Sequence, residues 1–288
     1  LYNRELAGAL AGVLHRPLDI LVFDECGMGM IETAHAVRKV ARIMIASEEL
    51  IPGRGTRMDY WLNPLIHCPG LGPSSVAALI VHTYQATIIC SPSYTMSAYD
   101  TTDIGTLSKA VSGLASAMLD ELPKHANEIL DARRKSLEYG AEFEPGRIDL
   151  ERFCSNIVLT STSWRLRWRA LQVIWWSRAL RVANGPSIFS SLRFGSNGLA
   201  IYFPLDGQRY CTDGSTECGY EHCNTHEPVE FVHDTAWSDF LHGYFAVVWS
   251  EKDGPDPQHP HALPATCEDL TKCAQGNSFE TSASGCSH

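Results

Sequence analysis

The amino-acid sequence predicts an α/β protein with an open, mostly parallel sheet that is flanked by helices and extended by an added helical section. Residues 18–23 and 41–45 are short, almost wholly apolar runs, which is typical of strands buried on both faces of a sheet. The residues that follow Met30, between these two runs, have the apolar spacing of a helix. Strands that alternate with helices in this way favour successive parallel strands joined by helical crossovers.

The other expected elements rest on capping and breaking residues. Pro73 suits the first turn of a helix and Asp103 suits an N-cap, whereas Pro123 is expected to separate two helices. The predicted order is helix 6–14, strand 18–23, helix from 30, strand 41–45, helices 55–67 and from 73, strand 95–99, helices 103–122, 124–139 and 164–182, strand 199–203 and helix 237–248.

An aromatic stripe marks the helix predicted over residues 164–182, because three tryptophans and a leucine recur there at intervals of three and four. The stripe consists of Trp164, Trp168, Leu171 and Trp175, and arginines surround it at positions 165, 167, 169, 178 and 181. Aromatic rings among cations can form a nucleic-acid platform, but a packed tryptophan face with snorkelling arginines is the usual explanation.

Composition limits the classes of partner. The 288-residue chain is long enough for one large domain or two small ones, and it carries a formal net charge of −10. This charge argues against nucleic acids and anionic membranes, which are bound through clustered Lys and Arg. No apolar run reaches the length of a membrane span. Basic or neutral substrates suit the chain better.

Cys26 is the leading candidate for a functional side chain, because it follows directly on the strand predicted over residues 18–23. Open α/β sheets carry out chemistry at the carboxyl ends of their strands. Gly27 and Gly29 allow a tight turn there, and the start of the next helix favours a thiolate over a thiol. A cysteine that acts only as a small buried apolar side chain is the alternative.

Residues 24–29 read Asp-Glu-Cys-Gly-Met-Gly, which resembles the Asp-Ala-Cys-Leu-Met-Gly nucleophile motif of the clostripain family of caspase-like cysteine peptidases. Five further blocks fall in the family's order, so the resemblance covers roughly residues 1–247. These blocks are residues 46–55 (Ala-Ser-Glu-Glu-Leu-Ile-Pro-Gly-Arg-Gly), 97–100, 148–150, 198–204 and 234–241. The resemblance implies a caspase-like fold and a cysteine endopeptidase with the Cys26 thiolate as nucleophile.

The resemblance also implies a histidine base in a His-Gly pair about fifty residues before the cysteine, whereas only 25 residues precede Cys26. His15 is the one histidine among them, and it enters the strand from the end opposite the thiol. His35 stands on the following helix and cannot easily turn back. We therefore expect the base to come from sequence before Leu1, on the same polypeptide or on an N-terminal light chain. A non-catalytic clostripain-like binding or surface module is the alternative.

Asp24 and Arg54 bear on specificity. The resemblance places Asp24 near the floor of the pocket for the substrate residue before the cleaved bond (P1), with a second acid from the Pro-Gly-x-Gly turn, and this pair would suit Arg or Lys. Here the second position is Arg54, which would pair with Asp24 or repel a basic side chain, unless it points to solvent. Glu25 replaces a small residue and either raises the pKa of the thiol or is solvated.

The C-terminal part differs from the rest of the chain in amino-acid composition, because it is rich in proline and polar residues. We expect a peptidase domain over residues 1–250, which lacks the His-Gly strand, a Pro-rich linker over 251–264, and a disordered or truncated Cys-containing tail over 265–288. Three cysteines crowd into residues 211–223 and suggest a disulfide-stapled insertion, a zinc site that would make the chain a metal-binding module, or unpaired thiols. Disulfides and the family resemblance favour a secreted or cell-envelope protein of bacterial type. No cofactor is expected, although the resemblance allows calcium.

Overall fold

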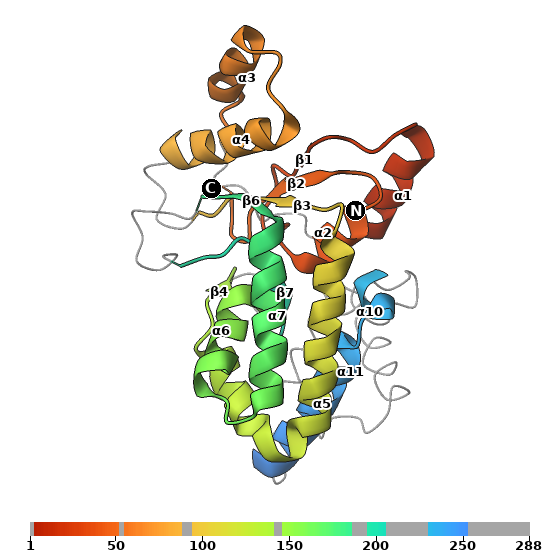
Figure 1. Cartoon of the computed structure of the whole chain (residues 1–288), viewed down its shortest axis with the longest axis vertical. Coiled ribbons are helices and arrows are strands. Elements are labelled where there is room, and N and C mark those ends of the chain that lie inside the picture. The colour runs from red at the N-terminus through yellow and green to blue at the C-terminus, as the bar shows by residue number, and fades with distance from the viewer. Residues whose placement is uncertain are drawn as a thin grey trace, which may run out of the picture.

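The computed structural model describes residues 3–51, 55–87, 94–140, 146–185, 195–205 and 230–252, and within these ranges helices enclose two sheets (Figure 1). The elements follow in the order α1 (Asn3–Val13), β1 (Leu21–Val22), α2 (Ile31–Val37), β2 (Ile43–Ala46), α3 (Met58–His67), α4 (Pro73–Thr87), β3 (Ser97–Asp100), α5 (Ile104–Arg134), β4 (Glu138–Tyr139), β5 (Arg147–Asp149), α6 (Leu150–Thr160), α7 (Trp164–Leu180), β6 (Arg181–Asn184), β7 (Ala200–Tyr202), α10 (Glu230–Asp234) and α11 (Trp237–Lys252).

The larger sheet has the strand order β1-β2-β3-β6. β1 and β2 are parallel, as predicted, with Leu21 opposite Met44. β3 is antiparallel to β2, and β6 is antiparallel to β3. The α/β class with flanking helices is therefore confirmed, but the described sheet is mixed rather than mostly parallel. Two helices, α3 and α4, separate β2 from β3, so the chain returns to the end of the sheet that it left, and β3 runs the opposite way.

The smaller sheet is antiparallel, in the order β4-β5-β7. The strand predicted over residues 199–203 is confirmed as β7, although it belongs to this second sheet. An isolated parallel bridge joins Met30 to Ala200, and the Ala200 N–H donates to the carbonyl of Gly29 at 2.8 Å. β7 therefore braces the segment that follows β1.

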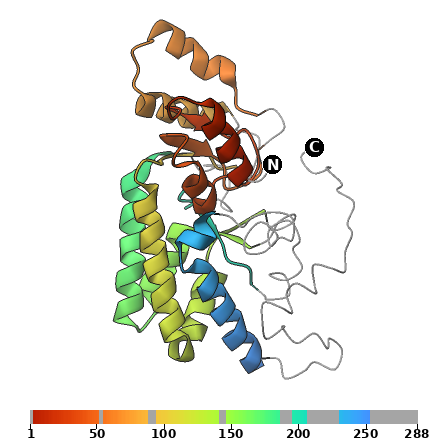
Figure 2. The same ribbon diagram turned by 90° about the vertical axis from the view of Figure 1, so that its right-hand side faces the viewer.

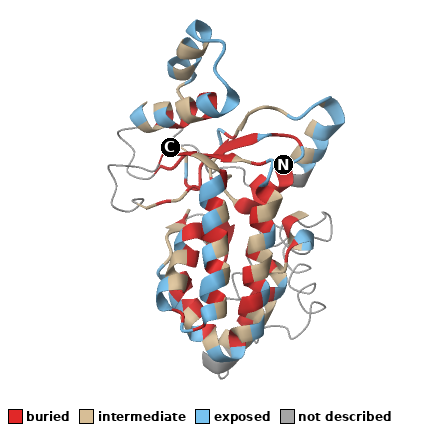
Figure 3. Cartoon of the chain, in the orientation of Figure 1, coloured by how far each residue is buried: buried red, intermediate tan, exposed pale blue. Residues whose placement is uncertain are grey.

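The larger sheet separates two apolar cores. Side chains alternate along β2, because Met44 packs into the core with α2, α5, α6, α7 and α11, while Ile43 and Ile45 pack into the core with α3 and α4. Figures 1 and 2 show α3 and α4 on one side of the sheet and the long helices on the other. The sheet and the inner faces of the long helices are buried (Figure 3).

The aromatic stripe on α7 faces solvent, so the predicted packed tryptophan face is wrong. Trp164, Trp168, Leu171 and Trp175 are 77%, 57%, 45% and 61% exposed. The opposite face is buried against α5 and α6 and carries smaller side chains, which are Leu166, Ala170, Val173, Ile174, Ser177 and Leu180. Small side chains let helices approach closely, so they occupy the crowded side of α7.

Two further expectations concern helix ends. The helices predicted on either side of Pro123 form one continuous helix, α5, with Pro123 inside it; proline removes one backbone hydrogen bond and bends a helix, and it need not end it. α11 extends to Lys252, and the predicted tail and most of the predicted linker lie outside the described residues. No helix in the described ranges combines the length and apolarity required to cross a bilayer.

Candidate active site

Cys26 lies in a turn just beyond the carboxyl end of β1. The Phe23 N–H still donates to the Ile45 carbonyl, at 2.9 Å, so pairing with the neighbouring strand continues past Val22. Gly27 then adopts a φ of +66°, in the left-handed region that favours glycine. The Cys26 side chain is half-buried. The predicted strand-turn-helix setting of this cysteine is therefore confirmed.

A second segment, residues 47–51, lies directly against this turn. The Ile51 N–H donates to Cys26 Sγ at 3.3 Å. The Gly27 N–H donates to the Glu49 carbonyl at 3.2 Å, and the Gly29 N–H donates to the Ser47 carbonyl at 2.7 Å. The Cys26 thiol also donates to the Ile51 carbonyl at 3.9 Å, so this segment positions Cys26 through the backbone of Ile51.

Asp24 lies against the turn that follows residue 54. The Thr56 N–H donates to Asp24 Oδ1 at 3.1 Å, and a Cβ atom on Gly55 would stand only 2.4 Å from Asp24 Oδ2. The structure thus brings Asp24 together with Gly55 and Thr56, the described residues at the end of the predicted Pro-Gly-x-Gly turn. Arg54 lies outside the described residues, so its pairing with Asp24 stays a prediction. Glu25 is exposed, in line with a solvated carboxylate.

Helix α4 contributes Tyr84 to the same region. The Tyr84 side chain is buried, and its hydroxyl has no hydrogen-bond partner among the described residues. Burial raises the pKa of Tyr84, and the negative charges of Asp24 and Cys26 raise it further. This phenol therefore stays protonated beside the two candidate residues.

Arg147 is a neighbour of the Cys26 turn that sequence reasoning missed. It begins β5, and a Cβ atom added to Gly27 would stand 1.9 Å from Arg147 Nη1. The guanidinium group therefore packs directly on the residue after the thiol. Nothing local in the sequence links these positions, because β5 and β1 belong to different sheets.

The histidines that the sequence offered are committed elsewhere or exposed. His35 is buried, and its ring nitrogens lie 2.8 Å from Ser108 Oγ and 2.8 Å from Asp234 Oδ2. Burial is the main cause that lowers the pKa of His35. His15 is exposed, and the ring of His67 bonds the Asn63 carbonyl at 2.8 Å. The prediction that His35 does not turn back toward the thiol is consistent with these contacts.

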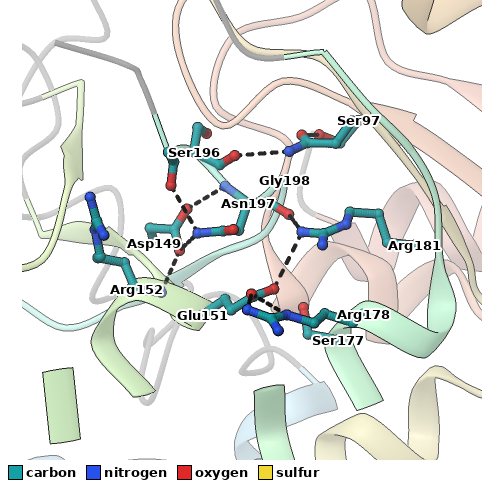
Figure 4. Close-up of polar contacts among 12 residues, drawn as sticks. Ser97, Asp149, Glu151, Arg152, Ser177, Arg178, Arg181, Ser196, Asn197 and Gly198 are labelled. Atoms are coloured by element: carbon teal, nitrogen blue, oxygen red, sulfur yellow. Dashed lines mark hydrogen bonds and ion pairs between the residues drawn. The ribbon is translucent and has the colours of Figure 1, made fainter. Parts of the chain in front are cut away.

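The side chain of Glu48, within the 47–51 segment, forms a buried pair of carboxyl groups with Asp149, which sequence reasoning also missed. Glu48 is 1% exposed and Asp149 is 0% exposed. Tyr139 and Ser196 lie between them, because the Tyr139 hydroxyl contacts Asp149 Oδ2 at 2.9 Å and Ser196 Oγ at 2.7 Å, and Ser196 Oγ in turn contacts Glu48 Oε2. Figure 4 shows the contacts of Asp149 with Arg152 and Asn197.

An ion-pair cluster borders this network. The Glu151 carboxylate is buried and accepts from Arg178 Nε at 2.6 Å and from Arg181 Nη1 at 3.3 Å. Arg181 also donates to the Asn197 carbonyl at 2.8 Å, which links the cluster to the loop before β7 (Figure 4). These arginines, counted in the sequence among those around the aromatic stripe, anchor α7 to α6 and to this loop.

Within the described ranges, no three His, Cys, Asp or Glu side chains gather as a metal site would require. The cysteines of residues 211–223 fall outside these ranges. The zinc, disulfide and calcium expectations therefore stay predictions.

Comparison with known proteins extends these observations. The model of the clostripain family matches residues 1–243. The comparison with curated proteins gave no match. A clostripain from Bacteroides thetaiotaomicron, solved with a peptide inhibitor, has a TM-score of 0.54 and 13% identity, and the match covers 82% of this chain and 94% of that one.

Two longer relatives share the fold. An inactive zymogen of a C11 protease from Parabacteroides distasonis has a TM-score of 0.56 and 15% identity over 80% of this chain and 61% of that one. A secreted C11 cysteine protease from Bacteroides thetaiotaomicron has a TM-score of 0.53 and 13% identity over 81% of this chain and 59% of that one. At these identities the structures establish the caspase-like fold, and the family model covers most of the chain. The chain belongs to the clostripain family.

Proposed function

We propose that this chain is the part of a cysteine endopeptidase that carries the nucleophile, Cys26. The observation that carries the proposal is the placement of a half-buried cysteine in a strand-end turn, with its Sγ 3.3 Å from the backbone nitrogen of Ile51. The clostripain fold supports a peptidase in general. The Cys26 thiolate would attack the peptide carbonyl carbon, the leaving amine would take a proton from a protonated base, and water would then hydrolyse the thioester.

We further propose that the base comes from a strand that pairs with the free edge of β1. Among the described strands, β1 pairs with β2 alone. β1 contributes apolar side chains to both cores, because Leu21 packs on one side of the sheet and Val22 on the other. Both residues are nevertheless only half-buried, whereas β2 is wholly buried. Such composition is typical of a strand inside a sheet. A strand from upstream sequence, or from an N-terminal light chain, would end beside Cys26.

Replacement of Cys26 by alanine tests the nucleophile. The protein should be expressed with the sequence encoded before Leu1, and hydrolysis of a fluorogenic peptide should be measured. Cys26→Ala should abolish hydrolysis and leave the circular-dichroism spectrum unchanged. Cys68→Ala is the matched control, because Cys68 is also a cysteine but lies exposed at the end of α3. Full activity in Cys26→Ala would end the proposal.

The same preparations test the origin of the base. The chain from Leu1 to His288 alone should hydrolyse peptides at least about 10²-fold more slowly than the longer protein, because general acid-base catalysis contributes about 10²–10⁴-fold. Equal rates would mean that a histidine within this chain is the base. No hydrolysis by either protein would favour the alternative, a non-catalytic binding or surface module.

Specificity is proposed to depend on Asp24 and Arg54. If Arg54 faces the pocket, it pairs with Asp24 and weakens preference for Arg or Lys at P1. Arg54→Asp should then raise that preference by about 10–100-fold, since a hydrogen bond to a charged group contributes about 1.5–3 kcal/mol. A panel of peptides that differ only at P1 measures the change. Strong wild-type preference for Arg that Arg54→Asp leaves unchanged would place Arg54 outside the pocket.

We also propose that the protein is exported. One structural relative is described as secreted, and the sequence contains 10 cysteines, which suits an oxidising compartment. Mass spectrometry of the purified protein before and after reduction would reveal disulfides.

A further inference from the structure

Glu48 and Asp149 form a buried acid pair that has no cation as partner. Each carboxyl group is almost wholly shielded from water, and no Lys or Arg side chain in the described ranges forms a salt bridge with either. Ionising both groups in such a site would be costly, because two like charges would share a region of low dielectric constant. At least one group must therefore hold a proton, or the site must reorganise.

The contacts of Asp149 identify it as the ionised member. Its Oδ1 accepts from the Arg152 N–H at 2.7 Å and from Asn197 Nδ2 at 3.0 Å. Its Oδ2 accepts from the Asn197 N–H at 2.7 Å and lies 2.9 Å from the Tyr139 hydroxyl. Three N–H donors, which cannot accept a proton, and one hydroxyl surround this carboxylate, whereas Glu48 accepts from one backbone N–H, that of Gly198. Because N–H donors favour the ionised form of a carboxyl group, the negative charge is better placed on Asp149.

Counting protons along the chain from Glu48 to Asp149 places the remaining proton on Glu48. Three contacts link the residues in order: Glu48 to Ser196, Ser196 to Tyr139 at 2.7 Å, and Tyr139 to Asp149 at 2.9 Å; Tyr139 also interacts directly with the Glu48 side chain. The two hydroxyl groups supply only two protons. With Glu48 ionised, Ser196 and Tyr139 would each donate to a carboxylate, and their own oxygens would meet at 2.7 Å with no proton between them.

We propose that Glu48 is protonated in the folded protein and acts as a positioning residue for Cys26 by completing this hydrogen-bond chain. Glu48 donates to Ser196, Ser196 donates to Tyr139, and Tyr139 donates to Asp149. Burial and the charge of Asp149 both raise the pKa of Glu48 well above its ordinary value. Burial also raises the pKa of Asp149, but the hydrogen bonds from Arg152 and Asn197 lower it in part, which agrees with the assignment.

The chain reaches Cys26 through the backbone on either side of Glu48. The Ser47 carbonyl accepts from the Gly29 N–H at 2.7 Å, and the Glu49 carbonyl accepts from the Gly27 N–H at 3.2 Å. Glu48 Oε1 accepts from the Gly198 N–H at 3.1 Å, next to β7. Loss of the proton would place a second negative charge beside Asp149 and push the 47–51 segment away from the smaller sheet. The turn that carries Cys26 would move with it.

Other titratable groups face the pair from the surrounding elements. Tyr139 of β4 and Tyr99 of β3 both have raised pKa values, mainly through burial, so they remain protonated phenols. Burial also raises the pKa of Cys154 on α6, with the charge of Asp149 as the next cause. Arg181 of β6, a cation of the neighbouring ion-pair cluster, is held by Glu151 and the Asn197 carbonyl. None of these groups supplies a counter-charge that would free Glu48 to ionise.

The pH dependence of stability tests the protonation state without any assay of activity. Because the pKa of Glu48 is raised above its ordinary value of 4.5, the folded state binds one more proton than the unfolded state between the two values. The unfolding equilibrium constant should therefore rise by up to tenfold per pH unit as pH increases through this window. Glu48→Gln, whose amide replaces the protonated acid and can donate to Ser196, should remove this dependence.

Two further variants sharpen the test. Glu49→Gln leaves the Glu48 to Asp149 chain intact, so it should keep the wild-type slope. Asp149→Asn must direct an amide N–H₂ at donors, so it should destabilise the fold far more than Glu48→Gln. Equal pH slopes in wild type and Glu48→Gln, failure of Glu48→Gln to fold, or a milder effect from Asp149→Asn would each overturn the proposal.

The positioning role rests on the proposed function, so it has its own readout. With the upstream sequence present, kcat/KM for a fluorogenic peptide should fall with rising pH in wild type as Glu48 ionises, and Glu48→Gln should retain activity to higher pH. Identical alkaline limbs in the two proteins would overturn the positioning role. If neither protein hydrolyses peptides, the proposed peptidase function fails, and the rate of Cys26 alkylation by iodoacetamide is then measured in place of kcat/KM. The pH profile of this alkylation rate must differ between Glu48→Gln and wild type. Identical alkylation profiles would overturn the positioning role of Glu48.

Discussion

Replacing Gly29 by alanine probes how tightly the turn after Cys26 is held. Gly29 donates its N–H to the Ser47 carbonyl at 2.7 Å, and its carbonyl accepts from the Ala200 N–H at 2.8 Å. A Cβ atom on Gly29 would lie 2.7 Å from the backbone nitrogen of Glu48 and 2.7 Å from the carbonyl carbon of Ser47. Backbone atoms cannot rotate away as a flexible side chain would, so the two segments would have to separate.

The expected cost follows from this geometry. Overpacking of a tight site costs about 1–3 kcal/mol, so Gly29→Ala should lower the free energy of unfolding by about that amount. The shift also moves Ile51 relative to the Cys26 sulfur, and a misplacement of about 1 Å near reacting atoms can cost about 10²-fold in rate. Urea unfolding followed by circular dichroism measures the first effect, and kcat/KM of the protein with its upstream sequence measures the second.

Gly105→Ala is the matched control. Gly105 lies in the first turn of α5, and a Cβ atom there would meet no heavy atom within 4 Å. Alanine is favoured over glycine in helices by up to about 1 kcal/mol, so this variant should be slightly more stable and equally active. If Gly29→Ala matches Gly105→Ala in stability and wild type in rate, the close contact between the Cys26 turn and residues 47–51 is wrong.

Two other predictions concern packing and a buried histidine. Trp237→Ala should lower the free energy of unfolding by about 3–5 kcal/mol, because Trp237 is 0% exposed and donates to the Tyr202 carbonyl at 2.8 Å. Trp164→Ala, at a position that is 77% exposed, should lower it by less than about 1.5 kcal/mol. Equal losses of unfolding free energy in urea titrations would contradict the placement of α7. Because burial lowers the pKa of His35 from 6.5, the unfolded state binds the extra proton, so the contribution of His35 to stability should fall as pH drops below 6.5 by up to about 1.4 kcal/mol per pH unit. This contribution is opposite in sign to that of Glu48, so each is read from the difference between wild type and its own variant. His35→Gln should flatten that part of the profile, and a profile that the substitution leaves unchanged would refute the argument.

The parallel pair β1 and β2 could be predicted from the sequence because both faces of each strand are covered. A strand covered on both faces must be apolar throughout, and residues 18–23 and 41–45 satisfy that condition without knowledge of their partners. The strands at 138–139 and 147–149 were missed because they are two and three residues long. Such short strands hold through pairing with each other and with β7, and no local periodicity marks them.

The orientation of α7 illustrates a different limit. Periodicity shows which side chains share a face of a helix, but it does not show which face turns inward. The tryptophan stripe carries the larger apolar side chains, yet α7 packs on both α5 and α6 through smaller residues such as Ala170 and Ser177. Close approach to two helices at once favours small side chains, and that condition depends on neighbours far away in the sequence.

The residues of the candidate site likewise divide into those that local sequence could place and those that it could not. Cys26 and Asp24 follow a strand within a few residues, so local sequence was enough to place them at its carboxyl end. Glu48 contacts a serine 148 positions away, and acidic side chains are normally expected at the surface, so no local signal marked it as buried. The block around residues 47–49 was noticed only as part of a family resemblance. Its physical role emerges once β7 and the smaller sheet are in place, because the proton that Glu48 is proposed to hold has a function only where Ser196 and Tyr139 link it to Asp149.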